Sequence, residues 1–143
     1  MSTQNIDQKR IDLQQLAGVL AGIECVEHAI VFGSAQDGII HAGSDLDVAV
    51  WLVAAGTQTL DSLLEIVSRI EETFAVTCDV TVLNTAGPVL RHEALKGRVL
   101  FVRPGSEEDF SKFYVGTCAE YEDLMAWRAR QLAYRGYSCP STA

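Results

Sequence analysis

Hydrophobic and polar positions change period along the chain, and these changes divide it into alternating helices and strands. Apolar residues recur with the helical period in three segments, 11–20, 60–74 and 106–132. Short apolar runs of the kind that form buried strands lie between these segments, at 28–32, 45–51, 76–84 and 98–102. This order predicts an α/β (α+β) domain with a sheet of about four strands, flanking helices and a helical C-terminus.

The length and composition indicate a single domain over residues 1–143. The chain is 48% hydrophobic, which is enough for a globular core at this length. We expect the core to span about 11–103, because a Pro-Gly pair then breaks the pattern. A helical segment follows at about 106–135, which Gly116 could divide into two helices, and we expect the tail 136–143 to be disordered.

Charge and cysteine content exclude several classes of function. The net charge is −8 and the Lys and Arg residues are scattered, which argues against direct nucleic-acid binding. The four cysteines are widely spaced and form no C-x-x-C pair, so a zinc site has little support. No signal peptide or long apolar segment is present, so we expect a cytoplasmic protein that does not bind membranes.

Two aspartates interrupt an apolar strand in the first half of the chain. Asp45 and Asp47 are two positions apart, so their side chains share one face, roughly 6.5–7 Å apart along the strand. Paired carboxylates repel each other unless a positive charge lies between them, and oxygen ligands suit Mg²⁺. Asp79 is a third acid within an apolar run, for which a solvated position on an edge strand is the alternative.

Gly33 and Ser34 end the strand that precedes this acid pair. A glycine at a strand end lets the backbone approach a ligand, and the following amides would bind an anion if they opened a helix. A phosphate at Ser34 and a metal at Asp45 and Asp47 together describe a nucleoside triphosphate with its Mg²⁺. The alternative, a surface turn with two solvated aspartates, does not explain why the acids interrupt a run directed into the core.

Gly-Ser, ten further residues and Asp-x-Asp resemble the signature of the DNA polymerase β-like nucleotidyltransferase superfamily. The small size and the residues at 84–101 are similar to the minimal nucleotidyltransferase (MNT) antitoxins, which pair with HEPN-domain toxins. The resemblance runs from about His28 to Val102. It implies a nucleotidyltransferase fold with a mixed central sheet, Mg²⁺ as cofactor and ATP as substrate.

The resemblance also implies roles for individual residues. Asp45, Asp47 and Asp79 would be catalytic and would bind Mg²⁺, whereas Gly33 and Ser34 would bind the nucleotide. Asp79 falls where active members carry a third carboxylate on the neighbouring strand. The implied reaction transfers AMP from ATP to a tyrosine of a partner HEPN ribonuclease toxin, held with the antitoxin in a hetero-oligomer.

The chain departs from MNT proteins at Asp37, where their Gly-Ser-x-Ala-Arg-Gly segment often has Arg. An anion at this position would repel a triphosphate. Arg91, Lys96 and Arg98 are the nearest candidate cations for phosphate, although surface charges near a helix end are the simpler interpretation.

Two other functions are compatible with the same residues. A binding-only antitoxin would occlude its toxin without catalysis, which Asp37 favours and the presence of all three acids opposes. A nucleotidyltransferase for a small acceptor such as an aminoglycoside would usually need a larger second region, for which 143 residues leave little room.

Overall fold

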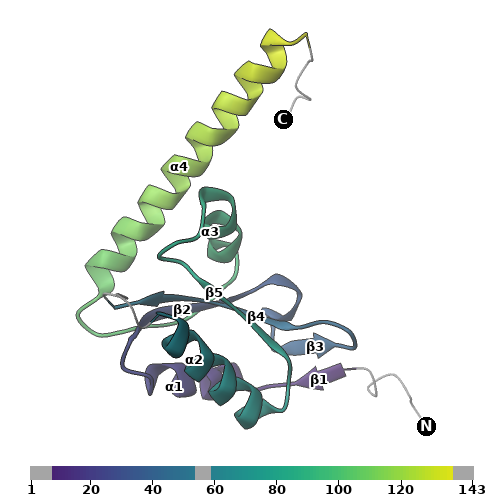
Figure 1. Cartoon of the computed structure of the whole chain (residues 1–143), viewed down its shortest axis with the longest axis vertical. Helices are drawn as coiled ribbons and strands as arrows, with labels where there is room; N and C mark the ends of the chain where they lie inside the picture. Colours follow the sequence, from purple (N-terminus) through teal and green to yellow (C-terminus); the bar gives the residue numbers. More distant parts are fainter. Residues whose placement is uncertain (1–7, 54–58, 137–143) are drawn as a thin grey trace.

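The computed structural model describes residues 8–53 and 59–136, and a four-stranded sheet forms its centre (Figure 1). The strands of this sheet are β2 (Val26–Phe32), β4 (Leu46–Leu52), β5 (Cys78–Val82) and β6 (Arg98–Val102). Their order is β5-β4-β2-β6, with β4 and β5 parallel and the other neighbours antiparallel. The predicted mixed sheet of four strands is therefore confirmed.

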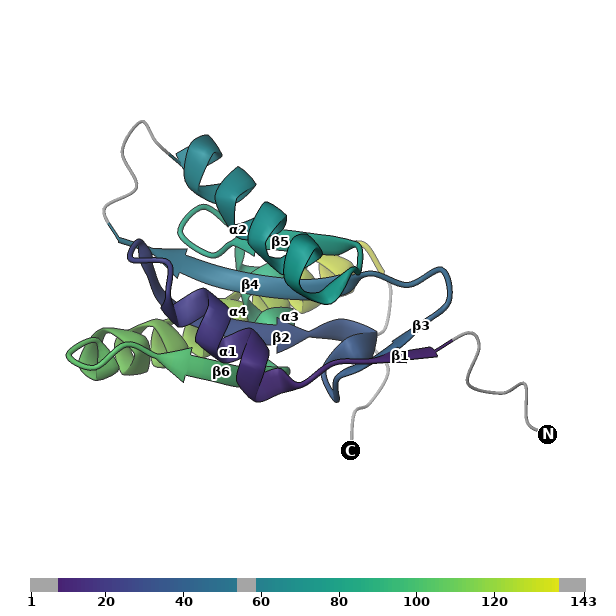
Figure 2. The same ribbon diagram turned by 90° about the horizontal axis from the view of Figure 1, so that it is seen from below.

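Four α-helices flank the sheet on its two faces. They are α1 (Leu13–Ala21), α2 (Thr59–Phe74), α3 (Pro88–Leu95) and α4 (Glu107–Tyr134). Helices α1 and α2 cover one face (Figure 2), and α3 and α4 lie on the other (Figure 1). The fold is thus a three-layer α+β arrangement in which the central sheet has a core on each side.

Side-chain alternation along β4 determines which residues enter each core. Leu46, Val48 and Val50 are fully buried against α1 and α2, as the alternation predicts. The opposite face carries a smaller core under α3 and the first turns of α4, to which Phe110 and Phe113 contribute. The fully buried residues of this second core are Ile30, Ala49, Leu83 and Ala94.

Helix α4 is continuous from Glu107 to Tyr134, so the division at Gly116 that the sequence suggested does not occur. It packs on the body as far as Tyr121, which stacks on His92 of α3 with ring centroids 3.7 Å apart. Its second half extends away from the sheet (Figure 1), and Tyr134 is 91% exposed. A helix packed along half its length keeps Gly116 helical because its neighbours on both sides are held in place.

The N-terminal segment contains a second, two-stranded sheet that the sequence pattern did not predict. Strands β1 (Gln8–Arg10) and β3 (Ile39–His41) pair antiparallel. The helix expected from about residue 11 begins at Leu13, because the Asp12 carboxylate caps it by accepting a hydrogen bond from the amide of Gln14 at 2.9 Å.

Two further expectations concern the C-terminal tail and the membrane. The tail predicted to be disordered, 136–143, lies almost wholly outside the described residues. Among the helices of the described residues, none combines the length and the apolar character needed to cross a membrane.

Candidate active site

Strand pairing brings two of the predicted acids side by side. Asp47 on β4 and Asp79 on β5 are register partners in the parallel pair, so their side chains leave the same face of the sheet. Asp45 directly precedes β4 and is exposed, as is Asp79, whereas Asp47 is partly buried. Asp47 and Asp79 therefore lie side by side at one end of the sheet, on the face opposite α1 and α2, and Asp45 precedes β4 at the same end.

The electrostatics of Asp47 reflect this crowding. Burial raises the pKa of the Asp47 carboxyl above its ordinary value, and the negative charges of Asp79 and Asp45 raise it further. Both neighbours therefore lie close enough to destabilise the ionised form of Asp47. A cation placed among the three carboxylates would reverse this effect.

Gly33 lies directly beside the side chain of Asp47. Its φ is +75°, a conformation that glycine adopts at little cost. A Cβ built on Gly33 would lie 2.6 Å from Oδ2 of Asp47, so any side chain at this position would displace the carboxylate. Glycine is therefore favoured here by the positive φ, and a larger residue would also make the end of the Asp47 side chain shift.

The amides that follow Gly33 do not open an α-helix, which was the condition for an anion site at a helix start. Residues Gly33–Ala35 form a single 3₁₀ turn, η1, and the chain then continues through exposed Gln36 and Asp37 and buried Gly38 to β3. One turn has no appreciable macrodipole, so a phosphate at this site would depend on individual amides and on the exposed Ser34 hydroxyl. The roles of Gly33 and Ser34 in nucleotide binding stay predictions.

The donor set suits Mg²⁺, since Asp45, Asp47 and Asp79 supply only hard carboxylate oxygens. Oδ2 of Asp47 lies in the space left free because Gly33 has no Cβ. Within 8–53 and 59–136, however, no three His, Cys, Asp or Glu side chains are grouped so that they could hold one ion. The catalytic and metal-binding roles of these aspartates are therefore predictions that their placement leaves open.

The three candidate phosphate-binding cations differ in their contacts. The Arg91 guanidinium is partly buried and donates to the carbonyls of Leu83 at 2.9 Å and Asn84 at 3.1 Å. Lys96 pairs with Glu93 on the surface of α3 at 3.0 Å, and Arg98 is exposed. Arg91 thus ties α3 to the end of β5, a structural role that the sequence did not suggest.

Asp37, the departure from the MNT pattern, has a local role. Its Oδ1 accepts a hydrogen bond from the amide of Ile39 at 3.0 Å, which closes a turn around Gly38 at φ +87°. An aspartate is suited to such a turn because its short side chain reaches the backbone two residues on. This contact explains the residue type without reference to a nucleotide.

Gly97 is a site residue that sequence reasoning did not single out. A Cβ at Gly97 would lie 2.6 Å from Cβ of Phe32, and Phe32 in turn pairs with Asp47 across β2 and β4. Gly97 therefore lets the start of β6 pack directly on the end of β2, beside Gly33. The only sequence signal was its predicted place as a helix terminator after α3.

Two comparisons with known protein families and curated proteins bear on this arrangement. Residues 14–105 match the model of the family described as "Polymerase beta, Nucleotidyltransferase". That match covers more than half of the chain and includes Gly33, Ser34 and all three aspartates. No curated protein matches the chain.

Solved structures with the same fold include several toxin–antitoxin proteins. A double Asp-to-Glu mutant of the MntA–HpeT toxin–antitoxin matches with a TM-score of 0.69 and 23% identity, over 86% of this chain and 97% of that chain. A toxin–antitoxin crystallised with AMP-PNP matches with a TM-score of 0.68 and 23% identity, over the same shares. A complex of tri-AMPylated Shewanella oneidensis HEPN toxin with MNT antitoxin gives 0.60 and 24%, over 84% of this chain and 96% of that chain. At these identities the likeness shows the fold.

Proposed function

Because this chain belongs to the polymerase β-like nucleotidyltransferase family, we propose that it is an antitoxin that transfers AMP from ATP to a tyrosine of a partner HEPN ribonuclease toxin. The observation that carries the proposal is the register pair of Asp47 and Asp79 beside Gly33. The named relatives add support, since one is a tri-AMPylated HEPN toxin with its MNT antitoxin and another contains AMP-PNP.

In the proposed reaction the tyrosine oxygen attacks the α-phosphorus of ATP. A new O–P bond forms, the bond to the bridging oxygen breaks, and pyrophosphate leaves. The Asp79 carboxylate, exposed at the open end of the sheet, accepts the phenolic proton. Gly33 gives the phosphates close access to the backbone, and the Ser34 hydroxyl donates to the outer phosphates.

Asp45, Asp47 and Asp79 would hold Mg²⁺ once their side chains turned toward one point, and the ion would neutralise charge that develops on the phosphates. The attached AMP would then add bulk and negative charge to the toxin near its nuclease site, where it would repel RNA. This sequence of events would explain how a small acidic protein neutralises a ribonuclease without having to bind RNA itself.

The test uses the purified chain, the product of the reading frame next to its gene as the candidate HEPN toxin, α-labelled ATP and Mg²⁺. We expect the toxin to acquire label and added AMP mass, and its ribonuclease activity to fall. Asp47→Asn should abolish labelling, whereas Asp61→Asn, an exposed acid in the first turn of α2, should not.

Three results would contradict the proposal in different ways. If the Asp47→Asn variant labelled the toxin fully, Asp47 would not be needed for AMP transfer. Neutralisation of the toxin by Asp47→Asn without any label would identify a binding-only antitoxin. Transfer of AMP to an aminoglycoside, with no transfer to the toxin, would identify a small-molecule enzyme.

A further inference from the structure

The two halves of helix α4 carry opposite charges. Although the chain as a whole has a net charge of −8, residues 124–135 contain no acid and three arginines: Arg128, Arg130 and Arg135. The preceding part of the helix has one lysine, Lys112, and six acids: Glu107, Glu108, Asp109, Glu120, Glu122 and Asp123. Helix α4 therefore consists of an acidic half on the body and a basic half that extends away from the sheet (Figure 1).

One face of α4 carries both charges and is open to contact along its length. Its residues follow alternating steps of four and three positions, the spacing at which two helices pack in a coiled coil. We call this face the α4 stripe, and it consists of Gly116, Glu120, Asp123, Trp127, Arg130 and Tyr134. Trp127 is 51% exposed and Tyr134 is 91% exposed. The three charged side chains of the stripe are exposed too, and none forms an ion pair within 8–53 and 59–136.

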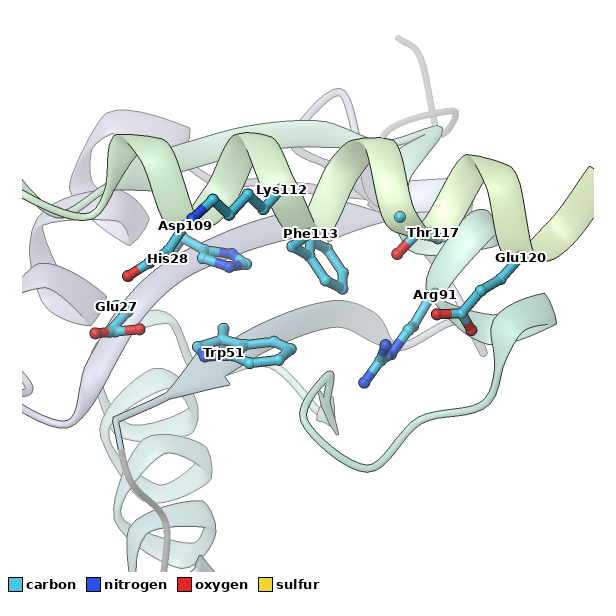
Figure 3. Close-up of a pocket in the computed structure, with 10 residues that line it drawn as sticks. Glu27, His28, Trp51, Arg91, Asp109, Lys112, Phe113, Thr117 and Glu120 are labelled. Atoms are coloured by element: carbon cyan, nitrogen blue, oxygen red, sulfur yellow. The ribbon is translucent and has the colours of Figure 1, made fainter.

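The acidic end of the stripe borders a hollow in the surface. A cavity of about 410 Å³ opens beside α4, and Gly116 and Glu120 are among the residues that line it (Figure 3). A glycine inside a helix is destabilising relative to alanine, yet a Cβ at Gly116 would meet nothing within 4 Å. Contacts within the chain therefore do not require glycine here. Glycine does allow a large side chain of another molecule to approach the helix backbone closely.

Two copies of the stripe complement each other when the helices run antiparallel. This arrangement places the basic half of each α4 on the acidic half of the other, and a two-fold axis makes the two contacts identical. When the axis passes midway between Asp123 and Trp127, Glu120 of each copy faces Arg130 of the other. The segment 116–134, which spans about 27 Å of helix, then forms the contact.

The other positions of the stripe also match in this register. Tyr134 of each copy faces Gly116 of the other, so that the largest exposed ring meets the position without a side chain. Trp127 faces Asp123, and its indole N–H can donate to the carboxylate. The two Trp127 rings lie on either side of the axis, where their apolar surface becomes covered.

The charge pattern favours a second copy of this chain over other occupants. The net charge of −8 includes +3 from residues 124–135, so the remainder carries −11 and would repel an RNA strand attracted to the arginines. A protein surface that fits the stripe must offer an acid opposite Arg130 and space opposite Tyr134, and the acidic half of α4 offers both. We propose that the α4 stripe is a homodimerisation surface through which two copies of this chain pair antiparallel.

Sedimentation equilibrium of the full chain, without toxin or nucleotide, measures this pairing independently of AMP transfer. We expect the mean mass to rise from 15.6 kDa toward twice that value as the protein concentration increases from micromolar to millimolar. A contact between two helices alone is small, so the dimer should dissociate on dilution. Added salt should weaken the pairing, because salt screens the attraction between Glu120 and Arg130.

Exchange of the two charges tests the register. Glu120→Arg and Arg130→Glu should each weaken the pairing about tenfold or more, because a two-fold pair contains the altered contact twice. The double variant Glu120→Arg/Arg130→Glu restores opposite charges and should pair like the wild type. Glu122→Arg and Arg128→Glu make the same charge changes two positions away and should pair normally, since residues two apart on a helix do not face the same way. Circular dichroism checks that each variant stays helical.

Several outcomes would overturn the proposal. A mass that stays at the monomer value over the whole concentration range would show that the stripe binds no second copy. If the variants at Glu120 and Arg130 then failed to bind the product of the neighbouring reading frame, that protein would be the occupant. Normal pairing in both single variants, or no recovery in the double variant, would place the contact elsewhere. Loss of pairing in Glu122→Arg or Arg128→Glu would mean that net charge alone controls association.

Discussion

His28 should make the stability of the protein strongly dependent on pH. Its ring lies in an aromatic cage, edge-on to Phe110 at 4.7 Å between centroids, 5.5 Å from Phe113 and stacked with Trp51 at 6.0 Å. Burial lowers its pKa from 6.5 to about 4. The folded state therefore keeps this histidine neutral over a range in which the unfolded state protonates it.

The magnitude follows from the two pKa values. Below pH 6.5 the unfolded state binds a proton that the folded state does not, so the free energy of unfolding falls by about 1.4 kcal/mol per pH unit. The loss continues until about pH 4, where the folded state also protonates, and amounts to about 3 kcal/mol. That is a large share of the roughly 5–15 kcal/mol that stabilises an ordinary domain.

Urea denaturation of the wild type and of His28→Phe between pH 7.5 and 4 tests this reasoning. Phenylalanine fits an aromatic cage but cannot titrate, so the variant should gain about 3 kcal/mol relative to the wild type as the pH falls. Parallel pH curves would refute the buried neutral histidine. An equal change in His41→Gln, which lies on the exposed end of β3, would show that any histidine has this effect.

Three further predictions concern the loop around the acids and the outer edge of the sheet. Gly33→Ala should lower stability by about 1–3 kcal/mol in urea and abolish AMP transfer, because its Cβ would strike the Asp47 carboxylate at a positive φ. Asp37→Asn keeps the acceptor for the Ile39 amide, so calorimetry at low salt should show unchanged ATP affinity; tighter binding would mean that the Asp37 charge reaches the nucleotide. Arg103→Lys should cost about 2 kcal/mol in thermal unfolding, since a lysine cannot replace a guanidinium that donates to three backbone carbonyls; an unchanged Tm would contradict this.

The central sheet and the place of the acids could be predicted because both depend on local pattern. The two-residue alternation along β4 sends Leu46 and Val48 to one core and leaves Asp47 on the other face. The parallel register then places Asp79 beside Asp47. Whether these carboxylates turn together onto an ion depends on side-chain rotation and on the ion itself, neither of which a strand pattern determines.

Other features escaped prediction because they depend on contacts between distant residues. Strands β1 and β3 have three residues each, and Gln8–Arg10 is polar and exposed, so no hydrophobic period marks it as a strand. Gly97 resembles an ordinary helix terminator until its contact with Phe32 is seen. Arg91 reads as a surface charge, although its guanidinium is tied to the carbonyls of Leu83 and Asn84.

The second face of β4 explains how one small domain could serve a protein acceptor. Asp47, Ala49 and Trp51 leave the strand on the same side. Helix α3 buries the middle position, Ala49, and its Arg91 guanidinium reaches over Trp51. Phe110 and Phe113 anchor α4 at the Trp51 end, while Asp45 and Asp79 at the other end stay exposed. A tyrosine on a folded partner could therefore reach the acids without displacing any helix of the described residues.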